Sequence, residues 1–405
     1  MRILFIGYWG LADSLTTSTI LTNLELLEQF EEVEHIVLAT IERQPAEPTI
    51  DLPSPNSKLS FRPLHSRPGR SLLLTKTDDF RRFPRELAEI MRDERLDVVI
   101  GHGAPGAALA YLVSRQTGHP FYATMFEPHA SYMLDARIWS WSDPRYLVQR
   151  LMEAQVKRLA AGIIPAADAY REQLVQEGVP AHRLRTGPCM VRLQEFRFDD
   201  EARHRVRQRL GFPEAAPVGI YVGKFGGLYY DQPAFDIFQE AVAQFGPDFH
   251  LIVLTPNPLA EVQARLTAIG IPATHCYVAL ADHRDVPEYL SAADFAFATV
   301  KYAPSNRFRS LVKVAEYWAC GLPVLLTEGV GDESVVIQRE GGGAIFNLAQ
   351  PGSLSRALER IRAQLQVPNY RVLIRRLAER YRSPERNRLA FQELLQFKPV
   401  VSAPR

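Results

Sequence analysis

The sequence contains very little cysteine: three residues, Cys189, Cys276 and Cys320, lie far apart in a chain of 405. No two of them form a Cys-x-x-Cys pair, so we expect neither a disulfide framework nor a structural zinc site. Long apolar runs are also missing, because no stretch approaches the roughly 18 consecutive apolar residues of a membrane-spanning helix. The first apolar run is too short for a signal peptide and is followed at once by glycine. These absences predict a cytoplasmic protein in a reducing compartment.

An excess of charge of one sign is missing as well, because 47 Lys and Arg balance 46 Asp and Glu. We therefore expect no nucleic-acid partner. Residues 58–95 do hold ten Lys and Arg against six acidic residues. Such a segment suits an anionic membrane surface or a lipid-linked acceptor, and equally a solvated face of mixed charge. Apolar residues make up 46% of the chain, which is enough material for two domains of ordinary size.

Short apolar segments alternate with helical patterns along the whole chain, and this alternation predicts an α/β fold. Residues 188–200 are irregular and polar, and the alternation restarts after them. Because the predicted strands are apolar throughout, we expect parallel sheets covered on both faces, in two Rossmann-like domains with a ligand cleft between them. The predicted strands are residues 3–6, 35–39, 59–61, 97–100, 121–126 and 162–165 in the first half, and 218–222, 249–254, 277–280, 295–299 and 323–326 in the second.

The most informative stretch reads SLVKVAEYWACGLPV and covers residues 310–324. Ser310, Lys313 and Glu316 are spaced by three and fall on one side of the start of a predicted helix. A helix N-terminus together with the Lys313 amine attracts a diphosphate, and the Glu316 carboxylate can accept hydrogen bonds from a ribose. The same spacing occurs in an amphipathic surface helix that stops at glycine, so a purely structural interpretation stays open.

This stretch resembles the nucleotide-sugar segment of GT-B fold glycosyltransferases of the retaining family-four type, the glycosyl transferases group 1. In that family a Glu-x7-Glu or a Ser-Pro-x-Lys-x-x-Glu-Tyr pattern precedes an Ala-Cys-Gly-x-Pro-Val turn, and residues 310–324 are similar to the second form. The first glutamate of the other form would fall at Phe308, so the chain lacks that carboxylate. The resemblance implies an acceptor-binding domain over 1–188, a donor-binding domain over 189–370, and helices over 371–405 that pack back on the first domain.

A second segment, Tyr-Val-Gly-Lys-Phe-Gly-Gly at residues 221–227, is similar to the turn that opens the donor domain of this family. Glycines such as Gly223 and Gly226 let a backbone approach a phosphate closely. The resemblance implies that the basic residue of the turn, Lys224, meets the donor diphosphate. Gly-rich turns are nevertheless common between strands and helices of any α/β protein.

Two further loops of the second half hold candidate substrate-binding residues. The family's additional lysine after the glycine-rich turn is missing here, and Arg307 or Arg309 could replace it, because arginine binds phosphate in a bidentate manner. The alternative for both is a solvated basic loop. Asp332 and Glu333 lie in a glycine-containing loop that the resemblance places near sugar hydroxyls, whereas an acidic helix N-terminus explains them without any ligand.

In the first half, candidate residues follow the predicted strands. Gly10 lies in a segment that resembles the glycine-rich loop near the acceptor and the donor phosphate. His102 ends a strand and faces the predicted cleft. His129 matches by position a family histidine that faces the sugar, where it could bind the sugar or relay a proton, and Glu127 is a candidate acid or base. Structural hydrogen bonds at strand ends are the alternative for both histidines.

Together these residues favour a glycosyltransferase that moves a sugar from a nucleotide-diphosphate sugar, first of all a UDP-sugar, to a glycan, lipid-linked or small-molecule acceptor, as in polysaccharide biosynthesis. Lys224 and Lys313 would stabilise the leaving diphosphate, with His129 and Glu316 as the other catalytic candidates, so we expect no metal and no cofactor. A lipid-linked acceptor would imply peripheral association with the inner face of a membrane. A nucleotide-sugar epimerase or hydrolase of the same fold, and a non-catalytic nucleotide-binding relative, remain the alternatives.

Overall fold

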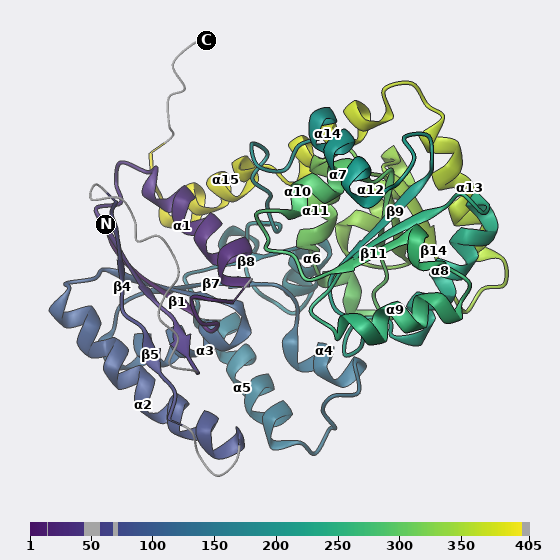
Figure 1. Ribbon diagram of the computed structural model, residues 1–405. Helices are drawn as coiled ribbons and strands as arrows, with labels where there is room; N and C mark the ends of the chain where they lie inside the picture. Colours follow the sequence, from purple (N-terminus) through teal and green to yellow (C-terminus); the bar gives the residue numbers. More distant parts are fainter. Residues whose placement is uncertain (14, 44–56, 68–71, 399–405) are drawn as a thin grey trace. The chain divides into compact units, whose positions relative to one another are not determined.

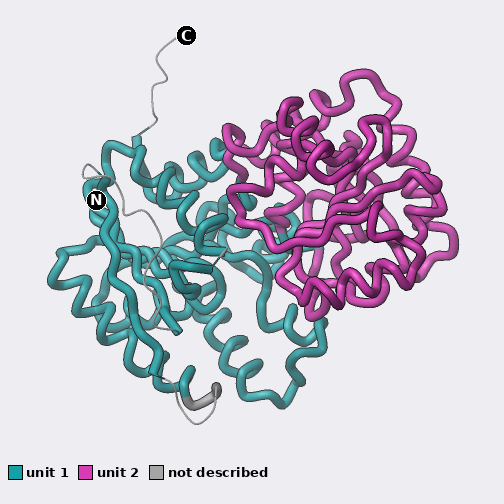
Figure 2. The backbone as a smooth tube through the Cα atoms, in the orientation of Figure 1, with its two compact units in different colours: residues 1–190, 307–309, 384–405 teal, residues 191–306, 310–383 magenta. Residues whose placement is uncertain are grey.

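The computed structural model describes residues 1–13, 15–43, 57–67 and 72–398, without the side chains of 72–74 (Figure 1). The chain divides into two compact units (Figure 2). Unit 1 comprises residues 1–190, 307–309 and 384–405, and unit 2 comprises residues 191–306 and 310–383. The chain thus first crosses from unit 1 to unit 2 after Met190, two residues after the boundary expected at residue 188. The expected C-terminal segment 371–405 is divided between the units at Pro384.

Unit 1 is built on a parallel sheet of six strands in the order β4-β2-β1-β6-β7-β8. Its apolar strands supply side chains to both faces: in the first strand, Leu4 and Ile6 enter one core and Ile3 and Phe5 the other. The six strands are β1 (Arg2–Gly7), β2 (His35–Ala39), β4 (Leu59–Phe61), β6 (Val98–His102), β7 (Phe121–Met125) and β8 (Gly162–Pro165), while β3 (Ile41–Glu42) and β5 (Leu64–His65) pair with each other.

Helices cover both faces of this sheet, and local chemistry sets several of their ends. The Asp143 side chain accepts a hydrogen bond from the Arg145 backbone N–H at the start of α5, and Gly118 ends α3 in the left-handed conformation. The last helix, α15, packs beside α1 (Figure 1). The helical segments are η1 (Thr16–Ile20), α1 (Leu21–Glu28), α2 (Leu72–Asp93), α3 (Gly103–Thr117), α4 (His129–Asp135), α5 (Pro144–Leu159), α6 (Asp168–Gln176), η2 (Ala181–Arg183) and α15 (Pro384–Leu395).

Unit 2 repeats this arrangement with the strand order β11-β10-β9-β12-β13-β14. In each unit the strand order runs outward in both directions from the first strand, β1 or β9. The carboxyl ends of β1 and β6, and of β9 and β12, are therefore the switch points where such folds bind ligands. The predicted fold of two Rossmann-like α/β units is confirmed. The strands are β9 (Val218–Val222), β10 (His250–Leu254), β11 (Cys276–Ala279), β12 (Phe295–Ala298), β13 (Val324–Thr327) and β14 (Gly343–Phe346).

The helices of unit 2 differ from the prediction in two places. The charged helix α7 was not predicted, because few apolar residues mark its periodicity. The C-terminal helical region is divided into two helices, α14 and α15, since Pro384 removes a backbone donor and starts a new helix. The segments are α7 (Asp200–Leu210), α8 (Gln232–Phe245), α9 (Leu259–Ala268), η3 (Ala273–His275), α10 (Val286–Ala292), η4 (Pro304–Phe308), α11 (Val312–Ala319), α12 (Gly331–Glu340), α13 (Ser353–Leu365) and α14 (Tyr370–Tyr381).

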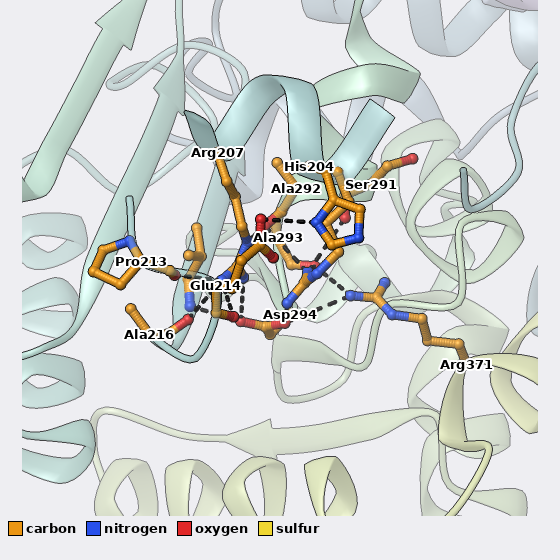
Figure 3. A network of polar contacts seen from close by, with 12 residues as sticks. His204, Arg207, Pro213, Glu214, Ala216, Ser291, Ala292, Ala293, Asp294 and Arg371 are labelled. Carbon is orange, nitrogen blue, oxygen red and sulfur yellow. Dashed lines mark hydrogen bonds and ion pairs between the residues drawn. The ribbon is translucent and has the colours of Figure 1, made fainter. Parts of the chain in front are cut away.

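A network of arginines around Asp294 fixes the start of β12 in unit 2 (Figure 3). The Asp294 carboxylate accepts hydrogen bonds from Arg203 and Arg207, both at 2.9 Å, and Arg371 lies 3.6 Å away. All three arginines also donate to backbone carbonyls at the C-terminal end of α10. Their positive charge is thus balanced by one carboxylate and by the negative end of a helix, which identifies the network as structural.

Candidate functional site

The amine of Lys313 lies against the glycine-rich turn that follows β9. Lys313 Nζ donates to the carbonyl of Val222 at 2.9 Å and lies 4.4 Å from the centre of the Tyr229 ring. Gly223 has a φ of 140°, and a Cβ there would lie 2.7 Å from the amine, so only glycine leaves room for it. The structure thereby brings together the two segments that the sequence predicts to bind the donor. Tyr229 is an additional residue that the sequence did not single out.

The tip of the same turn carries Lys224 and Gly226. The Lys224 side chain is exposed, and its carbonyl accepts a hydrogen bond from the Tyr221 hydroxyl at 2.6 Å, which fixes the turn. Gly226 has a φ of 83°, with open space where a Cβ would lie. Lys224 is therefore held at its backbone while its side chain stays accessible to a ligand. A contact with phosphate stays a prediction for both residues.

The buried carboxylate of Glu316 forms an ion pair with the partly exposed His283. Glu316 Oε1 lies 2.7 Å from His283 Nε2, and the Glu316 side chain is 7% exposed. The hydrogen bond to the carboxylate raises the pKa of His283 above its ordinary value. The two partners lie 33 residues apart in the sequence, so their spacing did not reveal this pair. A contact between Glu316 and a ribose stays a prediction.

Ser310 and Glu333 were expected to bind substrate, but the structure buries both and joins them to Arg382. Arg382 Nη1 donates to Ser310 Oγ at 2.9 Å, and Nη2 lies 2.8 Å from Glu333 Oε1. The same Glu333 oxygen accepts the Leu311 N–H at 2.8 Å. These contacts hold Ser310 and Glu333 in the interior of unit 2, and substrate binding by either residue stays a prediction. Asp332, half-buried at the start of α12, stays a candidate.

Residues 307–309 belong to unit 1, and they leave the position of the family's first glutamate without a carboxylate. Phe308 is 7% exposed and packs against the ring of Tyr170. The guanidinium of Arg307 lies 4.6 Å from the Phe308 ring centre, and that of Arg309 lies 4.9 Å from the Tyr132 ring centre. Both arginines thus stack on aromatic rings, and their role towards a phosphate stays a prediction.

Glu127 and His129 form a pair at the carboxyl end of β7. His129 Nδ1 lies 3.0 Å from Glu127 Oε1, and both side chains are largely buried. The Trp139 ring packs edge-on against the imidazole, with 5.7 Å between ring centres. A carboxylate partner on Nδ1 fixes the tautomer and orientation of a histidine, which suits Nε2 for accepting a proton. The structure therefore brings two of the predicted site residues of unit 1 together.

His102 was expected to face a ligand, but it lies in the interior of unit 1. It is 2% exposed, and its ring nitrogens lie 3.0 Å from Thr19 Oγ1 and 2.6 Å from Thr124 Oγ1. Burial lowers the pKa of His102 to about 3, so the imidazole is neutral at physiological pH. It lines a cavity of about 20 Å³, which has room for about one water molecule. These contacts give His102 a structural role, and its contact with a ligand stays a prediction.

Gly10 adjoins a carboxylate. A Cβ at Gly10 would lie 2.5 Å from an oxygen of Glu42, whose other oxygen accepts the Leu11 N–H at 2.9 Å. The glycine thus lets the Glu42 carboxylate lie close to this turn, whatever ligand the turn meets. Among the described residues, no group of three or more His, Cys, Asp or Glu side chains is placed to hold a metal ion.

Two family matches cover most of the chain. Residues 24–189 match the family described as Glycosyl transferase 4-like domain, and residues 216–364 match Glycosyl transferases group 1. The chain belongs to the group 1 glycosyltransferases of GT-B fold. It is therefore a glycosyltransferase, and the first match falls within unit 1 while the second falls largely within unit 2.

Solved structures of this fold are similar to the glycosyltransferase over nearly its whole length. Sucrose-phosphate synthase from Thermosynechococcus elongatus has a TM-score of 0.74 at 17% identity, with 98% of each chain covered. Anabaena HepE in complex with UDP and glucose has a TM-score of 0.71 at 14% identity, covering 98% of this chain and 99% of its own. Starch synthase IV from Arabidopsis thaliana, bound to ADP and acarbose, has 0.70 at 12% identity, with 98% of each chain covered. No curated protein sequence matches the chain.

Proposed function

We propose that this glycosyltransferase moves a sugar from a UDP-sugar to a glycan, lipid-linked or small-molecule acceptor. The observation that carries the proposal is the Lys313 amine, held between the Val222 carbonyl and the Tyr229 ring at the N-terminal end of α11. A lysine and a helix N-terminus beside a glycine turn form a suitable site for a diphosphate. HepE, which is bound to UDP-glucose in a solved structure, supports uracil as the base.

In the proposed reaction, the bond between the anomeric carbon and the diphosphate oxygen breaks while a bond to an acceptor oxygen forms. Lys313 and Lys224 stabilise the negative charge that develops on the leaving diphosphate, so we propose that no metal is required. Glu316 binds the ribose hydroxyls beside His283. The acceptor hydroxyl loses its proton, and His129 is our candidate to bind the sugar or to accept that proton.

We further propose that the acceptor is carried at the inner face of a membrane. The surface that supports this lies along α5 and the loop before it, where Trp141 is 72% exposed and Leu147, Val148 and Leu151 are all more than half exposed. Exposed Arg150 lies on the same helix, and such a mixture of apolar and basic side chains suits an anionic lipid surface. No helix of the described residues is long and apolar enough to cross a membrane.

The basic segment 58–95 supports this association less than the sequence suggests. Its Arg82 is paired with Asp78 and Glu86, and its Arg62 with Glu94. These pairs are typical of a solvated face of mixed charge. Residues 68–71 of the segment lie outside the described residues. Co-sedimentation with phosphatidylglycerol vesicles, lost on Trp141→Ser with Leu151→Ser, is the measurement that tests the α5 surface.

The donor proposal is tested by thermal unfolding with UDP, ADP, GDP, CDP and TDP, each with and without magnesium. At about 100 times its dissociation constant, a ligand adds about 2.7 kcal/mol of stability, which is a clear shift. We expect the largest shift with UDP and no need for magnesium. A shift with another base alone would replace the donor, and a strict need for magnesium would overturn the metal-free reaction. Product analysis without acceptor separates transfer from hydrolysis or epimerisation, because a transferase leaves most of its donor intact.

A further inference from the structure

The N-terminal end of α11 is capped by a residue from another helix. No side chain of α11's own N-cap residue, Leu311, satisfies its first backbone donors. The Leu311 N–H instead donates to Glu333 Oε1 at 2.8 Å, from the first turn of α12. A carboxylate at this position stabilises the helix, because it meets the positive end of the helix dipole. It also places a negative charge at the end of α11 that is proposed to receive a diphosphate.

Arg382 offsets this negative charge. Its guanidinium is 2% exposed and lies 2.8 Å from the same oxygen of Glu333, and it also donates to Ser310 Oγ at 2.9 Å. The backbone of Arg382 is held in place as well, because its carbonyl accepts the Val191 N–H at 3.0 Å. The first turn of α11 is therefore capped by an ion pair with no net charge.

We infer that Arg382 is a positioning residue for the donor: by neutralising Glu333 it lets the N-terminal end of α11 and Lys313 bind a diphosphate without repulsion from the capping carboxylate. The inference rests on the proposed function, because it needs a diphosphate at this end of α11. Arg382 itself need not touch the ligand. It acts through Glu333, whose charge would otherwise repel the phosphates as like charges do.

The titration of Glu333 supplies a readout that a merely structural arginine would not change. Burial raises the pKa of Glu333, and the facing charge of Arg382 opposes that rise while the neighbouring Asp332 adds to it. When Arg382 is removed, the pKa of Glu333 rises further. The carboxyl group is then neutral at low pH and ionises only as the pH increases. Repulsion of a diphosphate therefore appears only at high pH.

The experiment compares the affinity of UDP with that of uridine between pH 6 and pH 9, by calorimetry on the full chain. For Arg382→Met we divide the UDP dissociation constant of the variant by that of the wild type, and we expect this ratio to rise about tenfold from pH 6 to pH 9. We expect the affinity for uridine to stay unchanged. Arg382→Met combined with Glu333→Gln should bind UDP within about threefold of the wild type at every pH, because no charge remains to repel the phosphates.

The matched control is Arg375→Met, which removes an arginine that donates to the Ala319 carbonyl at the other end of α11. We expect no pH-dependent loss of UDP affinity in this variant. Equal losses in the single and double Arg382 variants, or an equal loss of uridine, would overturn the inference. If Arg382→Met does not fold, Glu333→Gln alone decides: UDP binding at least as tight as in the wild type supports the inference, and weaker binding contradicts it. A wild type that binds no nucleoside diphosphate would instead refute the proposed function.

Discussion

The first strands of the two units, β1 and β9, occupy the same place in their sheets, yet the turns that follow them face opposite charges. After β9, the missing Cβ of Gly223 makes room for the amine of Lys313. After β1, the missing Cβ of Gly10 makes room for the carboxylate of Glu42. The turns that follow the two first strands thus become attractive or repulsive for an anion through one neighbouring side chain. The fold places a turn at the end of each first strand, and the charge of the neighbouring side chain determines whether that turn attracts an anion.

Two histidines, one in each unit, also differ in pKa because their neighbouring groups differ. In unit 1, burial without an ionised partner lowers the pKa of His102 to about 3. In unit 2, the Glu316 carboxylate raises the pKa of His283. His102 therefore stays neutral at the end of β6. His283 instead keeps its proton to a higher pH, close to the proposed donor site.

Among the variants that test this difference between the units, we expect Lys313→Ala to have the largest effect. Removing the amine that lies against the turn after β9 should lower the catalytic rate about 10² to 10³-fold, because the charge of the leaving diphosphate loses a stabilising group. Steady-state kinetics with a UDP-sugar donor measure this. Glu42→Gln, the charge change at the equivalent turn of unit 1, is the matched control and should leave UDP affinity unaltered. Unchanged kinetics of Lys313→Ala would refute the assigned role.

Alanine at Gly223 and at Gly10 should have the next largest effect and should distinguish the two units. In Gly223→Ala the Cβ displaces the Lys313 amine, so we expect UDP affinity to fall about 10 to 100-fold. In Gly10→Ala the Cβ displaces Glu42, and we expect a loss of about 1–3 kcal/mol in the free energy of unfolding, with less than a threefold change in UDP affinity. Calorimetric binding and urea unfolding of both variants measure the difference. A comparable loss of UDP affinity in Gly10→Ala would show that unit 1 also meets the phosphates.

A smaller effect is expected from acid, through His102. Its pKa is about 3 in the folded chain and about 6.5 when unfolded, so the unfolded state binds the extra proton first. Stability from the neutral imidazole is present above pH 6.5 and is lost as the pH falls, by about 2 kcal/mol at pH 5. Urea unfolding of the wild type and of His102→Asn between pH 5 and 7 measures the difference. An equal slope in both proteins would exclude His102 as its source.

The smallest effect has the opposite sign and comes from His283. Its folded pKa is raised, so the contribution of its ion pair is complete below pH 6.5 and is lost as the pH rises through the folded pKa. We expect less than about 1 kcal/mol, because the imidazole is partly exposed. The wild type should therefore lose this increment between pH 6 and 8, and His283→Gln should not. A loss of the same size in His283→Gln would point to another titrating group.

Sequence predicted the fold well because its signal is local. The apolar strand 35–39 has the same limits in the structure as in the prediction, and the glycine turn and Lys313 segment lie together as their strand positions require. Helix α7 escaped prediction because its charged residues carry almost no apolar periodicity. Burial of His102 was missed too, since its two threonine partners come from other elements.

The rest of the candidate site depends on contacts between residues far apart in the chain. Glu316 was identified, but its partner His283 lies 33 residues earlier. Arg382 lies 72 residues after Ser310, directly after the end of α14, in a segment with no motif of its own. Such pairs leave no trace in spacing, because only the tertiary fold brings them together. Sequence therefore identified the residues that define the site more readily than the residues that support them.

The return of α15 to unit 1 has a consequence for the synthesis of the protein. Phe391 and Leu394 of this helix share a core with Ile3 and Phe5 of the first strand. A chain emerging from the ribosome therefore lacks part of the cover on one face of its first sheet until its last helix has been translated, whereas unit 2 is complete by Ser383. The order of folding is thereby reversed relative to the order of synthesis. Unit 2, although translated second, can complete its fold first, and unit 1 completes its fold only after α15 has been made.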